Sequence, residues 1–123
     1  MGILIAILIT IIALLHLYFM WFEMFAWTTK GRKIFKNFPP ELFEPTKPLA
    51  ANQGLYNGFL AAGLLWTFMI QDPVWQTNIS IFFLGCVTIA GIYGAFTATK
   101  KIFFIQALPA LLAIVLIVFN SFF

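Results

Sequence analysis

Four long apolar segments occupy nearly the whole chain of 123 residues, and they are residues 3–27, 49–71, 77–99 and 102–122. A helix rises about 1.5 Å per residue and a bilayer's hydrocarbon core is about 30 Å thick, so about 20 residues suffice to cross it. The intervening segments are too short for a separate soluble domain. The sequence therefore predicts one all-α membrane domain over residues 1–123, a bundle of four transmembrane helices with a loop over residues 28–48.

The composition agrees with a membrane solvent. Hydrophobic residues make up 63% of the chain and charged residues 9%, whereas a soluble domain carries roughly 25% charged residues. The single cysteine, Cys86, cannot form an intrachain disulfide. The apolar segments hold one histidine, one glutamate and no other strong metal ligand. These are too few for a zinc or iron site, so we expect neither a metal nor a cofactor.

The basic residues indicate how the four helices are oriented. All seven lie in the first and third connections: Lys30, Arg32, Lys33, Lys36 and Lys47, then Lys100 and Lys101. The second connection holds Asp72 and no basic residue. Loops rich in Lys and Arg stay in the cytoplasm. The sequence therefore predicts a multi-pass protein of the inner (plasma) membrane with both termini outside the cytoplasm.

Basic and aromatic residues alternate in the first connection, for example Lys33, Phe35, Lys36 and Phe38. Basic groups are attracted to anionic headgroups, and aromatic side chains insert at the interface. We therefore expect this connection to lie on the membrane surface and to contact lipid headgroups, with a gate over a pocket as the alternative. The positive charge serves topology here and does not indicate nucleic-acid binding.

Two ionisable residues stand out in the first segment, because such groups are costly inside a bilayer. His16 and Glu23 are seven residues apart, which is almost two helical turns, so both face the same way. An amide would hold helices together without the desolvation cost of a carboxylate. Glu23 is therefore the stronger functional candidate, and His16 is a candidate proton partner.

The second segment opens with a run of polar and small residues. At 100° per residue, four polar side chains span about 140° of the helix surface, and they are Asn52, Gln53, Tyr56 and Asn57. Gly54 and Gly58 fall on the opposite side, where small residues favour close helix packing. Gly91 and Ala95 are predicted to pack in the same manner on the third helix. For each polar residue, structural hydrogen bonding between helices is the alternative to ligand binding.

Polar residues of all four helices fall in the half of the bilayer next to the basic connections, whereas the other half is almost purely apolar. The predicted ligand-binding set is His16, Glu23, Asn52, Gln53, Tyr56, Asn57, Tyr93 and Gln106. A polar pocket that opens toward the cytoplasm follows if these faces point inward. Because four helices enclose little volume, we also expect a homodimer. Pro109 removes a backbone donor, which predicts a kink in the last helix.

Three functions fit this pocket. The first is binding or transport of a small hydrophobic or cationic molecule, with Glu23 as the charged group, and it is favoured over catalysis. The second is a membrane-embedded enzyme that modifies a lipid or isoprenoid with Glu23 and His16 as acid and base. The third is a scaffold subunit without catalytic activity.

Several of these motifs together resemble one protein family. They are the His16–Glu23 spacing, Trp27, the run Asn52-Gln53-Gly54-Leu55-Tyr56-Asn57-Gly58, and Gly91-Ile92-Tyr93-Gly94. They are similar to small bacterial integral membrane proteins classed as domain of unknown function 1304. The resemblance covers essentially the whole chain, and its most specific part is the Asn-Gln-Gly-x-Tyr-Asn run. It implies a four-helix membrane protein and assigns no activity.

Overall fold

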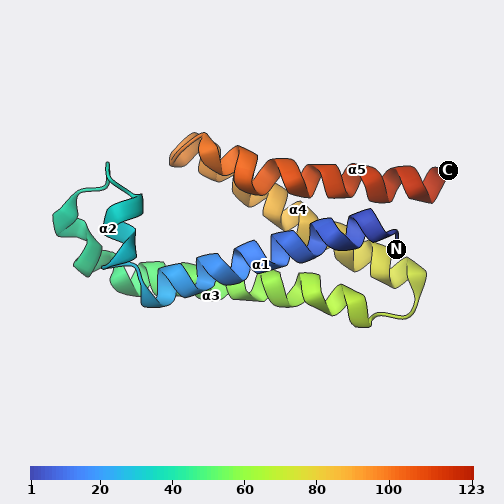
Figure 1. Cartoon of the computed structure of the whole chain (residues 1–123), viewed down its shortest axis with the longest axis horizontal. Coiled ribbons are helices and arrows are strands. Elements are labelled where there is room, and N and C mark those ends of the chain that lie inside the picture. The colour runs from blue at the N-terminus through green and yellow to red at the C-terminus, as the bar shows by residue number, and fades with distance from the viewer. The chain divides into compact units, whose positions relative to one another are not determined.

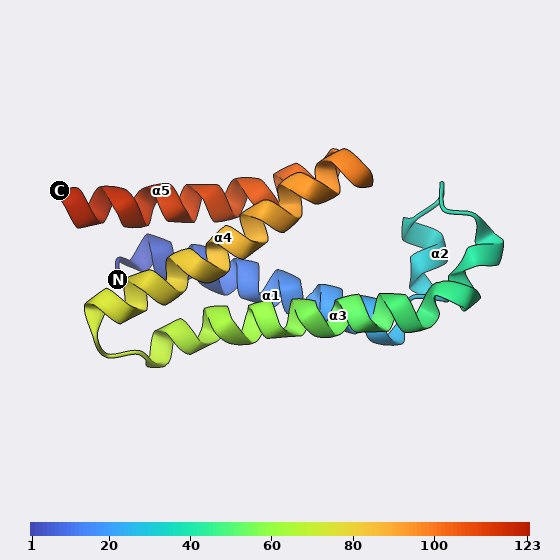
Figure 2. The same cartoon turned by 180° about the vertical axis from the view of Figure 1, so that it is seen from behind.

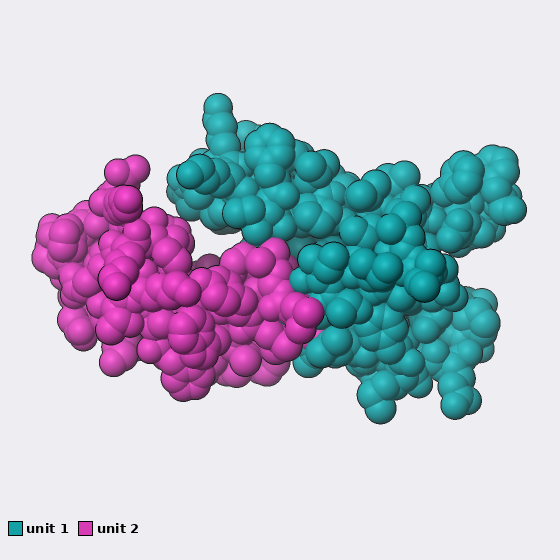
Figure 3. Space-filling model, in the orientation of Figure 1, with its two compact units in different colours: residues 1–13, 62–123 teal, residues 14–61 magenta.

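The computed structural model describes residues 1–123, and every regular element is helical (Figure 1). The long helices are α1 (Ile3–Phe25), α3 (Phe43–Trp66), α4 (Pro73–Thr97) and α5 (Leu108–Phe122). The short ones are α2 (Lys30–Ile34), the 3₁₀ turns η1 (Pro40–Leu42) and η2 (Thr67–Met69), and the π-helical turn η3 (Phe103–Ala107). The predicted all-α class is confirmed. The chain forms two compact units, Met1–Ala13 with Ala62–Phe123 and Leu14–Ala61 (Figure 3).

Three helical stretches are long and apolar enough to cross a membrane: α1, α4 and residues 103–122. Large apolar side chains project from them; Phe96, for example, is 87% exposed and Ile3 is 81% exposed. In water such a surface would be costly, because exposed apolar area is unfavourable. Lipid is therefore the solvent that suits these helices. α3 is as long, but its polar residues Asn52, Gln53 and Asn57 lower its hydropathy.

α3 begins at Phe43 and not at Leu49, so part of the expected loop is helical. The first four N–H groups of a helix have no partner within it, and Pro45 therefore loses nothing there. Pro48 lies inside the helix and not at its start. The Phe43 ring is buried, and this packing extends the helix beyond the boundary that the prolines indicated. At its other end, α3 passes into the 3₁₀ turn η2.

α4 begins at Pro73, earlier than the apolar pattern indicated. The Asp72 carboxylate accepts hydrogen bonds from the backbone N–H groups of Val74 at 2.9 Å and Trp75 at 3.0 Å. Asp is a favoured N-cap and Pro a favoured first residue of a helix. The Asp-Pro pair, which ends the second segment in sequence, therefore also starts the next helix.

In the unit of Met1–Ala13 and Ala62–Phe123, glycines allow backbones to approach closely. A Cβ atom on Gly91 would lie 2.6 Å from the backbone nitrogen of Ala107, in η3. η3 ends two residues before Pro109. The backbone N–H of Leu108 donates to the carbonyl of Phe103, five residues earlier. π-turns of this kind commonly occur where the regular backbone hydrogen bonds of an α-helix are interrupted. The predicted irregularity of the last helix is thus a π-helical turn before Pro109.

In the unit of Leu14–Ala61, the basic connection folds into a compact aromatic cap. The Trp27 ring contacts four phenylalanines at centroid distances of 5.3–6.1 Å, and they are Phe22, Phe35, Phe38 and Phe43. Its indole N–H donates a 3.0 Å hydrogen bond to the hydroxyl oxygen of Thr46. The Arg32 guanidinium donates to the carbonyls of Thr28 and Pro40, at 2.8 Å and 2.9 Å. These contacts order a segment that we had expected to be a surface loop.

Candidate functional site

The site centres on a hydrogen bond between α1 and α3. The side-chain amide of Asn57 donates to a carboxylate oxygen of Glu23 at 2.7 Å, and both side chains are half-buried. Glu23 lies in the last turn of α1, and the two helices run side by side here (Figures 1 and 2). A donor–acceptor distance of 2.7 Å lies in the range of well-formed N–H···O hydrogen bonds. The amide therefore fixes the position of the carboxylate.

Glycines on α3 set the separation that this bond requires. A Cβ on Gly54 would lie 3.0 Å from both the Cβ of Glu23 and the carbonyl oxygen of Met20. One turn later, a Cβ on Gly58 would lie 2.6 Å from the sulfur of Met20. A larger residue at Gly54 would meet the backbone of Met20 and push the helices apart, whereas at Gly58 it would meet only the flexible Met20 side chain. The glycine stripe thus brings the short Asn57 side chain within reach of Glu23.

No Lys or Arg side chain neutralises the Glu23 carboxylate. The Lys30 ammonium instead lies 5.2 Å from the ring centroid of Tyr18 and 5.5 Å from that of Trp21. Arg32 is engaged by backbone carbonyls of the cap. A carboxylate in an apolar helix without a cationic partner is expensive. Glu23 is therefore suited to take up a proton or a cation from outside the chain.

His16 is fully buried in α1, where its ring meets the Phe19 ring edge-on at a centroid distance of 5.5 Å. Seven residues separate it from Glu23, so the two lie about 10 Å apart along the helix axis. They are too distant to contact the same small group of atoms. No cluster of three His, Cys, Asp or Glu side chains suitable for a metal ion occurs in the structure.

The other predicted residues of α3 do not join Glu23. Asn52, Gln53 and Tyr56 are exposed, with Tyr56 at 58%. The predicted polar face is therefore divided: Asn57 lies about 60° from Gly54 around the helix axis and turns toward α1, whereas the rest point away. Sequence periodicity predicted the face, but the position of the neighbouring helix decides which side chains it encloses.

The remaining predicted residues belong to the unit of Met1–Ala13 and Ala62–Phe123. Tyr93 is 70% exposed on α4, and Gln106 is half-buried in η3. Gly91 is buried against Ala107, while Ala95 is half-buried. Gly63, which sequence reasoning did not select, also lies in close contact, because a Cβ there would overlap the Phe83 ring. Gly63 lies about 180° from Gly54 around the helix axis, so it is not part of the small-residue stripe that the sequence indicated.

The fold and the site define a small all-helical protein with membrane-type helices and a carboxylate between two of them. The chain belongs to the protein family of unknown function DUF1304, whose sequence model matches residues 10–118. It is 33% identical over 117 residues to the uncharacterized protein YpaA of Lactococcus lactis subsp. lactis (strain IL1403), covering 94% of this chain and 97% of that protein. No solved structure matches the chain. The predicted family is confirmed.

Proposed function

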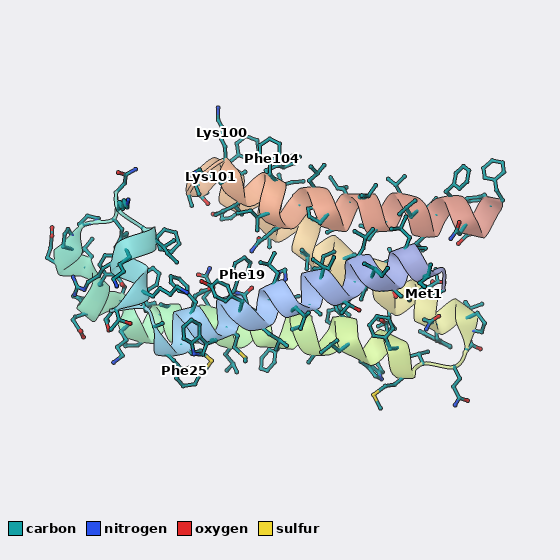
Figure 4. All side chains as sticks on the ribbon, viewed as in Figure 1. Met1, Phe19, Phe25, Lys100, Lys101 and Phe104 are labelled. Carbon is teal, nitrogen blue, oxygen red and sulfur yellow. The ribbon has the colours of Figure 1, made fainter.

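We propose that the chain is an inner-membrane protein with four spans, α3 being the fourth, and with both termini outside the cytoplasm. The 24 residues of α3 correspond to about 36 Å, enough to cross the hydrocarbon core. Lys100 and Lys101 are exposed in the connection between α4 and α5 (Figure 4). Four of the other basic residues lie between α1 and α3, and Lys47 lies near the start of α3. This distribution supports cytoplasmic connections on one side of the membrane, in contact with anionic headgroups.

Cysteine labelling tests this topology. In a Cys86→Ala background, we expect a membrane-impermeant thiol reagent to label Gln71→Cys in intact cells. We expect Asn37→Cys to react only after the membrane is permeabilised, with Lys100→Cys as a second cytoplasmic marker. All three positions are exposed. Labelling of Gln71→Cys and Asn37→Cys from the same side would show that α3 does not span.

We further propose that the protein binds a small hydrophobic cation at Glu23. The observation that carries this proposal is the half-buried carboxylate in a membrane-type helix, hydrogen-bonded to a neutral amide and paired with no Lys or Arg side chain. An incoming cation would supply the missing charge, and its apolar body would suit the polarisable side chains of Met20 and Met24 beside Gly54. The catalytic alternative has less support, because His16 and Glu23 are about 10 Å apart along α1.

The test uses tetraphenylphosphonium as a lipophilic cation. We expect purified protein in detergent to bind it saturably in equilibrium dialysis, with protons competing for the site. Uptake into proteoliposomes then separates transport from binding. Uptake driven by a proton gradient supports transport, and binding without uptake supports a receptor role. Absence of saturable binding to folded protein would contradict the proposal and favour a scaffold.

Substitutions of Asn57 and Asn52 form a matched pair, because both are asparagines of α3 and Asn57 is the one that bonds to Glu23. We expect Asn57→Leu to weaken tetraphenylphosphonium binding by roughly tenfold, since a hydrogen bond to a charged group contributes about 1.5–3 kcal/mol. Asn52 is exposed, so Asn52→Leu should leave the dissociation constant unchanged. Equal effects of the two substitutions would mean that the Glu23–Asn57 bond does not organise the site.

A further inference from the structure

A polar hollow of about 210 Å³ lies at the start of α1, in the unit of Met1–Ala13 and Ala62–Phe123. The first turns of α4 and the last turn of α5 form its other walls, and Figure 4 labels Met1 at this end of α1. Its polar side chains are Gln76, Thr77, Ser80, Asn120 and Ser121. We had expected this half of the membrane domain to be almost purely apolar, so the hollow corrects that expectation.

The hydrogen bonds around the hollow leave both donors and acceptors available. The hydroxyls of Ser80 and Ser121 donate to the carbonyls of Gln76 and Ile117, at 2.7 Å and 2.9 Å, so their oxygens can still accept. The Gln76 amide donates to the Thr67 carbonyl at 3.0 Å, which leaves its side-chain oxygen available.

Two further side chains in the wall, Thr77 and Asn120, form no hydrogen bond within the chain and offer both donors and acceptors. They come from different helices, Thr77 from α4 and Asn120 from α5. A ligand between these helices could therefore be held from two sides.

The charge of the hollow limits what it can bind. No Asp, Glu, Lys or Arg side chain lines it, and Met1, which carries the amino terminus, is among its lining residues and can donate hydrogen bonds to hydroxyl oxygens. The first free N–H groups of α4, on Val74 and Trp75, already bond to Asp72 and cannot receive an anion. Its volume equals that of about seven water molecules at about 30 Å³ each. A group with several hydroxyls, each able to donate and to accept, fits this combination of size and hydrogen-bonding capacity.

We propose that this hollow binds a neutral polyhydroxylated group, either the sugar headgroup of a membrane lipid or a free polyol. The ends of membrane-spanning helices lie at headgroup level, so both sources can reach it. The proposal is independent of the cation site, because the two sites share no residue.

Native mass spectrometry of the intact protein tests the proposal, in a detergent whose headgroup carries no hydroxyl. The lipid arm offers a neutral monoglucosyl diacylglycerol against phosphatidylcholine of the same chain length. The free-polyol arm adds glucose or glycerol, measured directly and as a competitor of the glucolipid. We expect the wild type to retain glucosyl compounds in preference to phosphatidylcholine.

Substitutions of residues in the wall of the hollow show whether the ligand binds there. Thr77→Val keeps the shape of the side chain, and Asn120→Leu removes the amide; each should weaken binding by roughly fivefold, and the pair by roughly 25-fold. Asn78→Leu changes an exposed neighbour outside the hollow and should have no effect. Circular dichroism confirms that each variant is folded.

The outcomes distinguish a lipid headgroup from a free polyol and test whether the hollow is the binding site. Retention of the glucolipid without competition by free sugar identifies a lipid headgroup site, and binding of free glucose or glycerol identifies a polyol site. Equal retention of glucolipid and phosphatidylcholine would overturn the proposal. So would binding that Thr77→Val and Asn120→Leu leave unchanged.

Discussion

Replacing Glu23 by glutamine should weaken tetraphenylphosphonium binding by about 100-fold, because loss of one partner of a desolvated charge pair costs roughly 2–5 kcal/mol. The substitution preserves the size of the side chain and an oxygen that can accept the Asn57 hydrogen bond. It removes only the negative charge. Equilibrium dialysis with purified protein measures the dissociation constant directly.

Glu41 provides the control for this prediction. It is an exposed carboxylate in η1, so Glu41→Gln also replaces one carboxylate by an amide and should leave binding unchanged. Glu23→Gln should remain folded, because removing an unpaired carboxylate from an apolar helix relieves its desolvation cost. If Glu23→Gln binds the cation as tightly as the wild type, the carboxylate is not the binding group.

The second large effect is on stability. Gly91→Ala places a Cβ 2.6 Å from the backbone nitrogen of Ala107 and 2.9 Å from its Cβ. Backbone atoms of a packed helix cannot move aside as a flexible side chain can, and overpacking of this kind costs up to about 3 kcal/mol. We expect a clear fall in the midpoint of thermal unfolding in detergent, followed by the loss of helical circular dichroism.

Gly85 is the matched control, because it lies in the same helix and a Cβ there would meet nothing within 4 Å. Gly85→Ala should stabilise the protein by up to about 1 kcal/mol, since alanine is the better helix former. The two substitutions add the same methyl group and should shift the midpoint in opposite directions. Shifts of the same sign and size would contradict the close approach of α4 to η3.

Much of the helical content could be predicted from the sequence, because long apolar segments have few alternatives in a membrane. Helix ends were harder. The start of α3 depends on the packing of Phe43 in the aromatic cap, which no local pattern encodes. The Asp72-Pro73 signal was present, but it marked the start of α4 as well as the end of the preceding segment.

The candidate site could also be predicted only in part, because its geometry depends on how the helices pack. The cost of a carboxylate in an apolar helix singled out Glu23 from sequence alone, and the small-residue stripe indicated Gly54 and Gly58. Periodicity could not tell which of the polar residues of α3 would meet α1, because that depends on helix rotation. The polar hollow was missed because its polar side chains come from two helix ends that lie far apart in the sequence, three from α4 and two from α5.

The central claim is that the Glu23 carboxylate meets a hydrophobic cation inside the membrane domain. Solid-state NMR can measure the dipolar coupling between the labelled side-chain carboxyl carbon of Glu23 and the phosphorus of tetraphenylphosphonium in lipid bilayers. We predict a coupling that corresponds to a separation of about 6 Å, the range of a direct charge pair, and its loss in Glu23→Gln. A bound cation without coupling to Glu23 would contradict the claim.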